Sequence, residues 1–158
     1  MAYWLLKSEP DVFSVDDLAH GTKPEPWDGV RNYQARNFMR DQMQPDDLAF
    51  FYHSNTKQPA IVGIMRIVTA GYPDHSAWQA DHPYFDPKSA PDNPRWYRVD
   101  VAFERRLTRP ITLQELKTYA ASHLAGLPLL ARGNRLSVMP VNDQQWQFIL
   151  ALETKHGC

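Results

Sequence analysis

The chain has 158 residues, of which 43% are hydrophobic, and a formal net charge of -1 at pH 7. This length and hydrophobic content suit one globular domain with a full core, spanning residues 1–158. A net charge near zero argues against a protein that grips duplex nucleic acid mainly through its phosphates.

The charge is unevenly distributed along the chain. Residues 1–94 hold 8 Lys and Arg against 13 Asp and Glu, a net charge of -5, whereas residues 95–158 hold 9 against 5, a net charge of +4. A local basic face is one interpretation, and solvated charge on ordinary strands is an equally good one. The arginines of this excess are Arg95, Arg98, Arg105, Arg106, Arg109, Arg132 and Arg135.

The single cysteine, Cys158, is the last residue, so the sequence offers no intrachain disulfide and no cysteine-based zinc site. This fits a reducing compartment, and we expect a cytoplasmic protein. The sequence shows no basic and apolar leader and no long apolar run. We therefore expect neither a signal peptide nor contact with a membrane.

The predicted elements begin with a short buried strand over residues 3–7. Ser14, followed by Val15-Asp16-Asp17, has the pattern of a helix N-cap and predicts a short helix that ends at Gly21. Residues 22–28 contain two prolines and are expected to form a stiff loop.

Residues 32–43 fit a helix with an inward apolar face. The inward side chains are expected to be Tyr33, Phe38 and Met39.

Residues 48–53 and 60–70 predict two strands that a polar loop joins. Residues 71–94 contain five prolines and four Asp and are too long for a plain connection. We expect this segment to drape over the domain or to form part of a binding rim.

Residues 96–107 alternate between apolar and mostly polar positions and give the clearest strand of the chain. A capping box at Thr112 predicts a helix to about His123, and residues 136–138 predict a short strand. Asn142 is expected to cap a last helix. The inward residues of that helix are expected to be Trp146, Ile149 and Leu150.

This order of elements is mixed and lacks the regular alternation of a doubly wound α/β sheet. The strands outnumber the helices, which are short and lie between them. The pattern favours an α+β fold, in which a small, partly open β-barrel is flanked by short helices.

The most informative run is Trp27-Asp28-Gly29-Val30-Arg31-Asn32-Tyr33-Gln34-Ala35-Arg36. An aromatic face, a guanidinium and an amide are the groups needed to hold a flat polar ring, with the Trp on the ring face and the polar groups on its edge. A simpler interpretation is that Trp27 covers a hydrophobic core and that Arg31 and Arg36 lie on a solvated helix face.

Three further blocks accompany this run: YWLLKSEP at residues 3–10, FFYHSN at 50–55 and RLSVMPV at 135–141. In this order, from about residue 3 to residue 146, the four blocks resemble the EVE domain family. The resemblance implies a PUA-like fold, related to the YTH and ASCH domains. It also implies recognition of modified nucleobases, chiefly modified cytosines in DNA and also modified bases in RNA.

A pocket for such a base needs aromatic faces, edge-reading groups and cations. Trp27 and Tyr52 are the candidate faces, and we expect them to line one concave pocket with Asn32 and Ser54. Tyr52 points opposite to Phe51 if its strand is regular, so one of the two faces away from the core. Ser137 either points into the pocket or bonds a backbone group. The full set of candidate ligand-binding residues is Lys7, Ser8, Trp27, Arg31, Asn32, Tyr52, His53, Ser54, Arg135 and Ser137.

No catalytic constellation is evident, and we expect no catalytic residue, metal or cofactor. The sequence contains no P-loop, no nucleophile elbow, no dinucleotide-binding glycine motif and no His-Glu-x-x-His run. Ser8, Ser54 and Ser137 have no evident base beside them, so an enzyme would need an unusual site. His75 and His82 lie among aspartates, where solvated loop residues are expected rather than metal ligands.

We therefore expect a monomeric nucleic-acid-binding domain that reads a modified nucleobase, modified cytosine in DNA, in an aromatic-walled pocket. Binding should be weak or should depend on a partner effector protein, because a stack of about 1–3 kcal/mol barely offsets the unstacking of the base. The alternatives are an RNA-binding domain that reads a modified RNA base, a small enzyme acting on a nucleotide-like metabolite, and a scaffold whose groove holds a peptide. Paired titratable groups with shifted pKa values would favour the enzyme.

Overall fold

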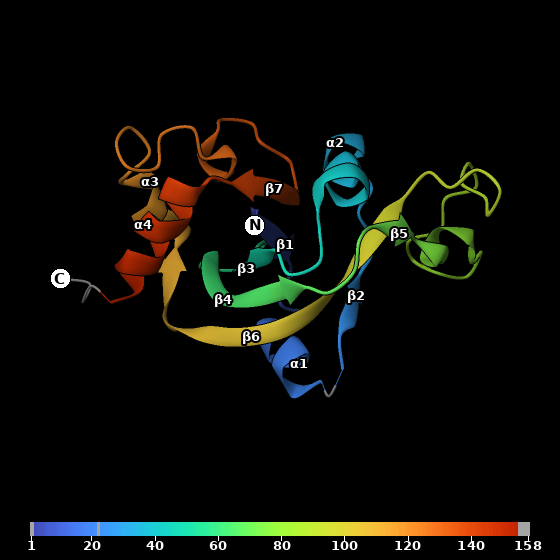
Figure 1. Ribbon diagram of the computed structural model, residues 1–158, viewed down its shortest axis with the longest axis horizontal. Coiled ribbons are helices and arrows are strands. Elements are labelled where there is room, and N and C mark those ends of the chain that lie inside the picture. The colour runs from blue at the N-terminus through green and yellow to red at the C-terminus, as the bar shows by residue number, and fades with distance from the viewer. Residues whose placement is uncertain (1, 22, 155–158) are drawn as a thin grey trace.

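The computed structural model describes residues 2–21 and 23–154, and Thr22 of the predicted loop and the terminal Cys158 lie outside them. One curled sheet, which forms a half-barrel, organises the molecule (Figure 1). Its order is β2-β6-β4-β3-β1-β7, with the short β5 paired to β6. The strands are β1 (Tyr3–Ser8), β2 (Glu25–Trp27), β3 (Leu48–His53), β4 (Ala60–Ile67), β5 (Tyr72–Pro73), β6 (Tyr97–Thr112) and β7 (Val138–Val141).

Short helices lie on both sides of this sheet. The α-helices are α1 (Val15–His20), α2 (Tyr33–Asn37), α3 (Leu113–Lys117) and α4 (Asp143–Glu153). A π-helical stretch, Phe38–Gln42, continues α2, and 3-10 turns occupy His75–Trp78 and Pro128–Leu130. None of the described helices has the length and apolar character that crossing a membrane requires.

The sheet is antiparallel except where β1 and β3 pair in parallel. A parallel pair needs a crossover connection. Residues 9–47 form this crossover connection, which contains α1, β2 and α2. The register of β3 against β4 shifts between Phe51 and Tyr52, and that of β4 against β6 shifts at two further places. Such irregularities bend strands and increase their twist, so the sheet curls instead of staying flat.

Both faces of the curled sheet are covered, and each has its own hydrophobic core. Successive side chains of a strand point to opposite faces. Phe51 accordingly packs in the core under α1 and α2, while Phe50 packs in the core under α4. In the second core the Trp146 ring stacks on Phe50 with centroids 3.9 Å apart and on Tyr3 at 4.4 Å.

The predicted fold class, an α+β fold with a partly open barrel and short helices, is confirmed. The N-caps predicted at Ser14 and Asn142 are both formed, each as a capping box. At Thr112 the hydroxyl accepts from the backbone N–H of Glu115 at 3.1 Å, and α3 ends at Lys117, before the predicted His123.

Three local predictions are wrong. Glu25–Trp27 is a strand at the sheet edge, paired with β6, rather than part of a loop. Pro26 is tolerated there because an edge strand can leave one side of its backbone unpaired. Tyr33 is 51% exposed instead of facing inward, since Ala35 and Met39 fill the buried positions of the helix. The last strand begins at Val138, two residues later than predicted.

Candidate functional site

A cavity of about 600 Å³ opens beside the C-terminal end of β1. Five separate stretches of the chain form its wall, namely residues 7–13, 25–30, 54, 82–84 and 135–137. The lining residues are Lys7, Ser8, Glu9, Val12, Phe13, Glu25, Pro26, Trp27, Asp28, Gly29, Val30, Ser54, His82, Tyr84, Arg135, Leu136 and Ser137.

Trp27, the last residue of β2, belongs to both the pocket and the core. Its exposed fraction is 6%, and its ring makes edge-to-face contacts with two other aromatic rings. The Phe51 centroid lies 5.2 Å away with the planes at 80°, and the Phe13 centroid lies 6.1 Å away, also at 80°. These contacts fix the indole before any ligand arrives, so a ring that stacks on it loses little freedom from the protein side.

Tyr84 forms another aromatic part of the wall and lies directly against Gly29. The φ angle of Gly29 is +78°, in the left-handed region that favours glycine. A Cβ at this position would lie 2.5 Å from the Tyr84 ring. Burial raises the pKa of the Tyr84 phenol, with the nearby Asp28 adding to the effect. The hydroxyl is therefore neutral near pH 7.

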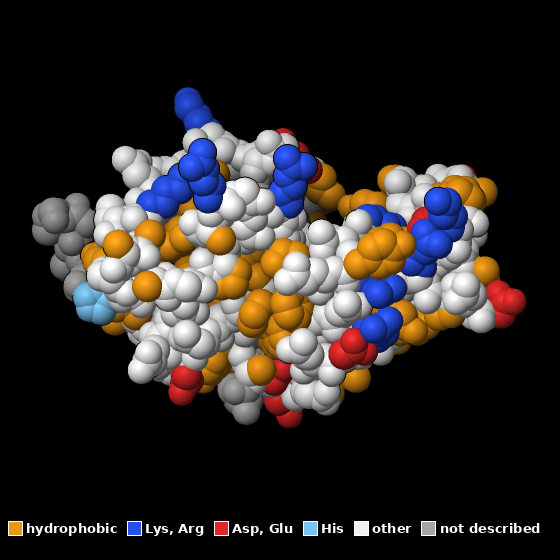
Figure 2. Space-filling view, turned by 90° about the horizontal axis from the view of Figure 1, so that it is seen from above, with side chains coloured by type: hydrophobic (Ala, Val, Ile, Leu, Met, Phe, Trp, Pro, Cys, Tyr) orange, Lys and Arg blue, Asp and Glu red, His pale blue; other side chains and the backbone are white. Residues whose placement is uncertain are grey.

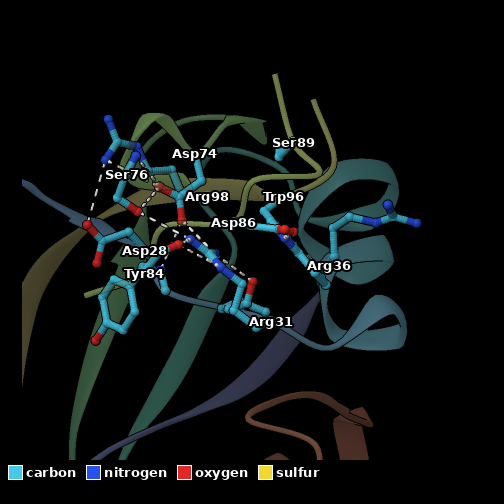
Figure 3. A network of polar contacts seen from close by, with 12 residues as sticks. Asp28, Arg31, Arg36, Asp74, Ser76, Tyr84, Asp86, Ser89, Trp96 and Arg98 are labelled. Atoms are coloured by element: carbon cyan, nitrogen blue, oxygen red, sulfur yellow. Dashed lines mark hydrogen bonds and ion pairs between the residues drawn. The ribbon is translucent and has the colours of Figure 1, made fainter. Parts of the chain in front are cut away.

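Asp74 holds this side of the pocket together (Figure 3). Its carboxylate is fully buried and accepts hydrogen bonds from the backbone N–H of Gly29 at 3.0 Å, from Arg31 Nη1 at 3.1 Å and from the backbone N–H of Ser76 at 3.0 Å. Burial alone would raise the pKa of Asp74, but the hydrogen bonds from Ser76, Gly29 and Arg31 outweigh it and lower the pKa. The carboxylate thus stays ionised and anchors residues 74–76 to the Gly29 turn.

Arg31 extends the same network to Tyr84. Its Nε donates to the Tyr84 carbonyl at 3.2 Å, and its guanidinium lies 5.6 Å from the Tyr84 ring centroid. Arg98 lies on the other side of Asp74, with Nη1 3.7 Å from Asp28 Oδ2 and 3.9 Å from Asp74 Oδ1. Its Nε is buried without a hydrogen-bond partner. Arg31 and Arg98 therefore support the pocket wall from behind.

The pocket itself presents both signs of charge. Burial raises the pKa of Asp28, and the neighbouring Asp74 adds to the effect. Burial lowers the pKa of Lys7, whose Nζ lies 6.0 Å from the Tyr52 ring centroid. Arg135 is exposed at the rim. A carboxylate and an ammonium thus share the cavity with the indole of Trp27 and the apolar groups of Val12, Phe13 and Leu136.

The model of the EVE domain matches residues 2–152 of this chain. The chain belongs to the EVE domain family. It is 50% identical to thymocyte nuclear protein 1 of Mus musculus over 166 residues, which cover 96% of this chain and 73% of the mouse protein.

Solved structures of other proteins share this fold closely. Human THYN1, in a crystal structure in complex with 5-methylcytosine-containing DNA, has a TM-score of 0.91 at 46% identity, with 99% of each chain covered. A protein from Pseudomonas syringae also has a TM-score of 0.91, at 47% identity, with 96% of this chain and 99% of that chain covered.

The pocket of this EVE domain brings together six of the ten residues predicted from the sequence. They come from both ends of the chain and from its middle, which the sheet places side by side. These six are Lys7, Ser8, Trp27, Ser54, Arg135 and Ser137. Ser8 and Ser137 also have structural roles, because the Ser8 hydroxyl donates to the Phe13 carbonyl at 2.6 Å and the Ser137 carbonyl accepts from the Lys7 backbone N–H at 2.8 Å.

The other four predicted residues, Arg31, Asn32, Tyr52 and His53, lie outside the lining. Asn32 caps α2, with its side-chain oxygen accepting from the Ala35 backbone N–H at 2.9 Å. His53 Nε2 accepts from the Val15 backbone N–H at 3.1 Å, and burial lowers the pKa of this imidazole. Arg31 is the support described above.

Tyr52 packs in the core under α4, and burial raises its pKa to about 12. The prediction that Trp27, Asn32, Tyr52 and Ser54 line one pocket is therefore wrong for Asn32 and Tyr52. Both faces of β3 are covered, so a side chain that points away from Phe51 still finds a core.

Sequence reasoning missed several residues of the wall. Asp28 lies within the run that drew attention to Trp27, and its place beside an aromatic residue was the available signal. His82 and Tyr84 come from the proline-rich segment expected to drape or form a rim. The sequence analysis treated His82 only as a solvated loop residue, and nothing in the sequence distinguished Tyr84. Among residues 2–21 and 23–154, no group of three or more His, Cys, Asp and Glu side chains could hold a metal ion.

Proposed function

We propose that this EVE domain binds a modified cytosine of DNA, with the base inserted in the pocket beside Trp27. The observation that carries the proposal is the fixed indole of Trp27 and the carboxylate of Asp28 in one cavity of about 600 Å³. That volume lies within the range of roughly 300–1,000 Å³ typical of small-molecule sites. The complex of human THYN1 with 5-methylcytosine-containing DNA, at 46% identity, supports the proposal.

Each part of a cytosine finds a complementary group in this pocket. The base stacks on Trp27, a contact that contributes about 1–3 kcal/mol. Asp28 accepts a hydrogen bond from the exocyclic amine, the pairing by which carboxylates distinguish cytosine. Val12, Phe13 and Leu136 supply the apolar surface on which a C5 methyl group packs. Lys7 and Arg135 bind the sugar-phosphate groups at the rim.

We also propose that the domain binds the base without catalysing a reaction on it. The Ser8 hydroxyl donates to a backbone carbonyl, and His82 Nδ1 accepts from the Tyr84 backbone N–H at 3.1 Å. The two side chains thus have partners other than each other. A base in a duplex must first be unstacked at a cost of a few kcal/mol, so affinity for DNA is modest and a partner effector protein adds to it.

The test is a titration of the purified domain with single strands that differ only in one central base. Burial of one methyl group is worth about 0.8 kcal/mol, so 5-methylcytosine should bind about fourfold more tightly than cytosine. Thymine, which keeps the methyl group and loses the amine, should bind more weakly than 5-methylcytosine. Equal affinity for cytosine and 5-methylcytosine would contradict the proposal. Tighter binding to RNA strands would favour RNA as the substrate.

A further inference from the structure

A second candidate contact surface lies next to the pocket, on the outer side of α2. It consists of Tyr33, Arg36 and Arg95 and is called the α2 surface below. On the face of the molecule that holds α2 and residues 74–96, Lys and Arg side chains gather around exposed hydrophobic side chains (Figure 2). Tyr33 is 51% exposed, unusual for a large aromatic side chain in this protein.

Among the described residues, Arg36 forms no ion pair, and Asp41, the carboxylate whose pKa its charge lowers, is already paired with Arg40. The Nη1 of Arg36 donates to the Arg95 carbonyl at 2.9 Å, and its Nε and Nη2 donate to Asn37 Oδ1 at 3.1 and 2.8 Å. These acceptors are neutral, and they use three of the five N–H groups of a guanidinium. Figure 3 shows its side chain directed away from the Asp74 network, whereas Arg31 and Arg98 point into it.

Several arginines elsewhere differ from Arg36 in this respect. Arg105 is bonded to Glu153 at 2.6 Å, Arg106 to Asp16 at 2.6 Å and Arg109 to Glu115 at 2.7 Å. Arg95, Arg98 and Arg106 pair with Asp86, Asp28 and Asp16, which come from the acidic part of the chain. The basic excess of residues 95–158 is therefore largely offset by these carboxylates in the folded protein. Arg36 comes from the acidic part of the chain and is half-buried, with hydrogen bonds to neutral acceptors only.

The α2 surface is held in place by stacked rings. The Tyr33 ring stacks on Trp96 with centroids 4.9 Å apart, and the Arg36 guanidinium lies 4.9 Å from the Tyr33 centroid. Trp96 is fixed in turn, because its Nε1 donates to Asp86 at 2.6 Å. A guanidinium that is already ordered loses little entropy when it binds an anion.

The same contacts connect the α2 surface to the pocket wall through Trp96 and Arg31. The guanidinium of Arg31 lies 5.5 Å from the Trp96 ring centroid and 5.6 Å from that of Tyr84, which lines the pocket. A strand that extends from a base in the pocket along these residues can therefore reach Arg36. A phosphodiester is the anion that a nucleic acid offers at that distance.

We propose that the α2 surface binds the phosphodiester backbone next to the base in the pocket, with Arg36 as the phosphate ligand. This inference rests on the proposed function. It adds a contact that is independent of base identity, since phosphate contacts position a nucleic acid and base contacts specify it. Arg95, whose guanidinium lies 3.8 Å from Asp86, adds a second and partly neutralised charge.

The test compares Arg36→Gln with Arg66→Gln, which removes an exposed guanidinium already paired with Asp46 and Glu104. Single-stranded nonamers with a central 5-methylcytosine or cytosine are titrated at several salt concentrations. Removal of one phosphate contact reduces the salt slope by about 0.7, which is about fivefold in affinity at 0.1 M salt. Arg36→Gln should lose this amount on both nonamers, and Arg66→Gln and Arg36→Lys should lose little.

A free nucleoside separates the two proposals. Binding of 5-methyldeoxycytidine, followed by chemical shifts, should be unchanged in Arg36→Gln, because the nucleoside has no phosphate. If Arg36→Gln and Arg66→Gln behave alike on the nonamers, the α2 surface is not a phosphate site. A loss of nucleoside binding in Arg36→Gln would also overturn the inference. If the wild-type domain binds both nonamers equally, the function proposed for the pocket fails, whatever Arg36 does.

Discussion

The ring of Tyr84 lies so close to the Cα of Gly29 that a Cβ there would be 2.5 Å from the ring carbons. This contact joins residues 55 positions apart and defines one wall of the pocket. It also gives glycine two separate reasons to be at position 29. The backbone has a φ of +78°, and the space where a side chain would begin is filled.

We predict that Gly29→Ala destabilises the domain more than Gly126→Ala does. Gly126 has a similar φ of +83° but nothing within 4 Å of the added Cβ, so only backbone strain of about 1–2 kcal/mol applies there. Gly29→Ala adds the clash with Tyr84. Urea unfolding of both variants measures the difference. Equal losses would mean that Tyr84 moves aside freely and is not a fixed wall.

Replacement of Trp27 should affect stability and binding together. Because the indole is 6% exposed and packed against Phe51, Trp27→Ala should lower the free energy of unfolding by about 3–5 kcal/mol. Trp27→Phe keeps an aromatic ring and should lose less stability, while the stack with the base becomes smaller. Thermal melting combined with titration of the 5-methylcytosine strand measures both. If folded Trp27→Phe binds the base with unchanged affinity, Trp27 has a purely structural role.

The pH dependence of stability should reveal Asp74. The pKa of Asp74 is lower in the folded protein than in the unfolded chain, where it is about 3.9. Its contribution is therefore fully present above about pH 5 and is lost as the pH falls through the folded value. Asp74→Asn should lower the free energy of unfolding near pH 7 by about 2–3 kcal/mol, below the usual loss for a fully buried pair, since Arg31 is partly exposed.

Unfolding of wild type and Asp74→Asn between pH 7 and pH 3 tests this. The two curves should approach each other below about pH 4, because the unfolded wild-type chain takes up a proton at Asp74 there while the folded carboxylate stays ionised to a lower pH. Asp41, an exposed carboxylate paired with its neighbour Arg40, provides the matched control, because Asp41→Asn should change little at any pH. A gap between wild type and Asp74→Asn that stays constant to pH 3 would contradict the assignment.

Asp28 should determine which base the pocket accepts. Asp28→Asn replaces a group that only accepts hydrogen bonds by one that also donates, so thymine becomes tolerable. Base-edge pairs are worth about 1–3 kcal/mol of discrimination, and the ratio of affinities for 5-methylcytosine and thymine should fall about tenfold. Glu9→Gln is the control, because Glu9 also lines the pocket but is exposed and bonded to Asn55 at 2.6 Å. An unchanged ratio in Asp28→Asn would exclude Asp28 from base recognition.

The wild-type domain should bind single strands with a modest dependence on salt. Lys7, Arg36 and Arg135 offer about two or three phosphate contacts, which correspond to a slope near -2 of log affinity against log salt concentration. Fluorescence anisotropy between 50 and 300 mM salt measures this slope. A much steeper slope, with no preference between modified and unmodified strands, would mean that a basic surface does the binding and that the pocket does not.

The sequence predicted those parts of the fold that local patterns determine. The N-cap of Ser14 and the strand over residues 48–53 are visible in a few neighbouring residues, and both were predicted correctly. The edge strand Glu25–Trp27 was not, because its pairing partner Val99 is more than 70 residues away. Tyr33 was placed inward by helical periodicity, which the π-helical stretch after Asn37 disturbs.

The same distinction explains the site. Trp27, Ser8 and Ser54 stood out because of their residue types and their place in family motifs, and they line the pocket. Tyr52 shares such a motif but lies on the side of β3 that faces the core under α4, and the packing of α4 is not visible in the local sequence. Tyr84 is one aromatic residue in a long proline-rich segment, and only the contact with Gly29 reveals its role.

The pocket wall is assembled from five stretches that lie between residue 7 and residue 137. No short fragment of the chain contains the whole wall, so the cavity exists only while the domain is folded. A ligand that enters it acts as a reversible cross-link between the first strand and the last third of the chain. Its binding free energy therefore appears as resistance to global unfolding, about 2.7 kcal/mol at a hundredfold excess over Kd. Melting temperature alone can thus rank bases and strands against this protein, without a label on either partner.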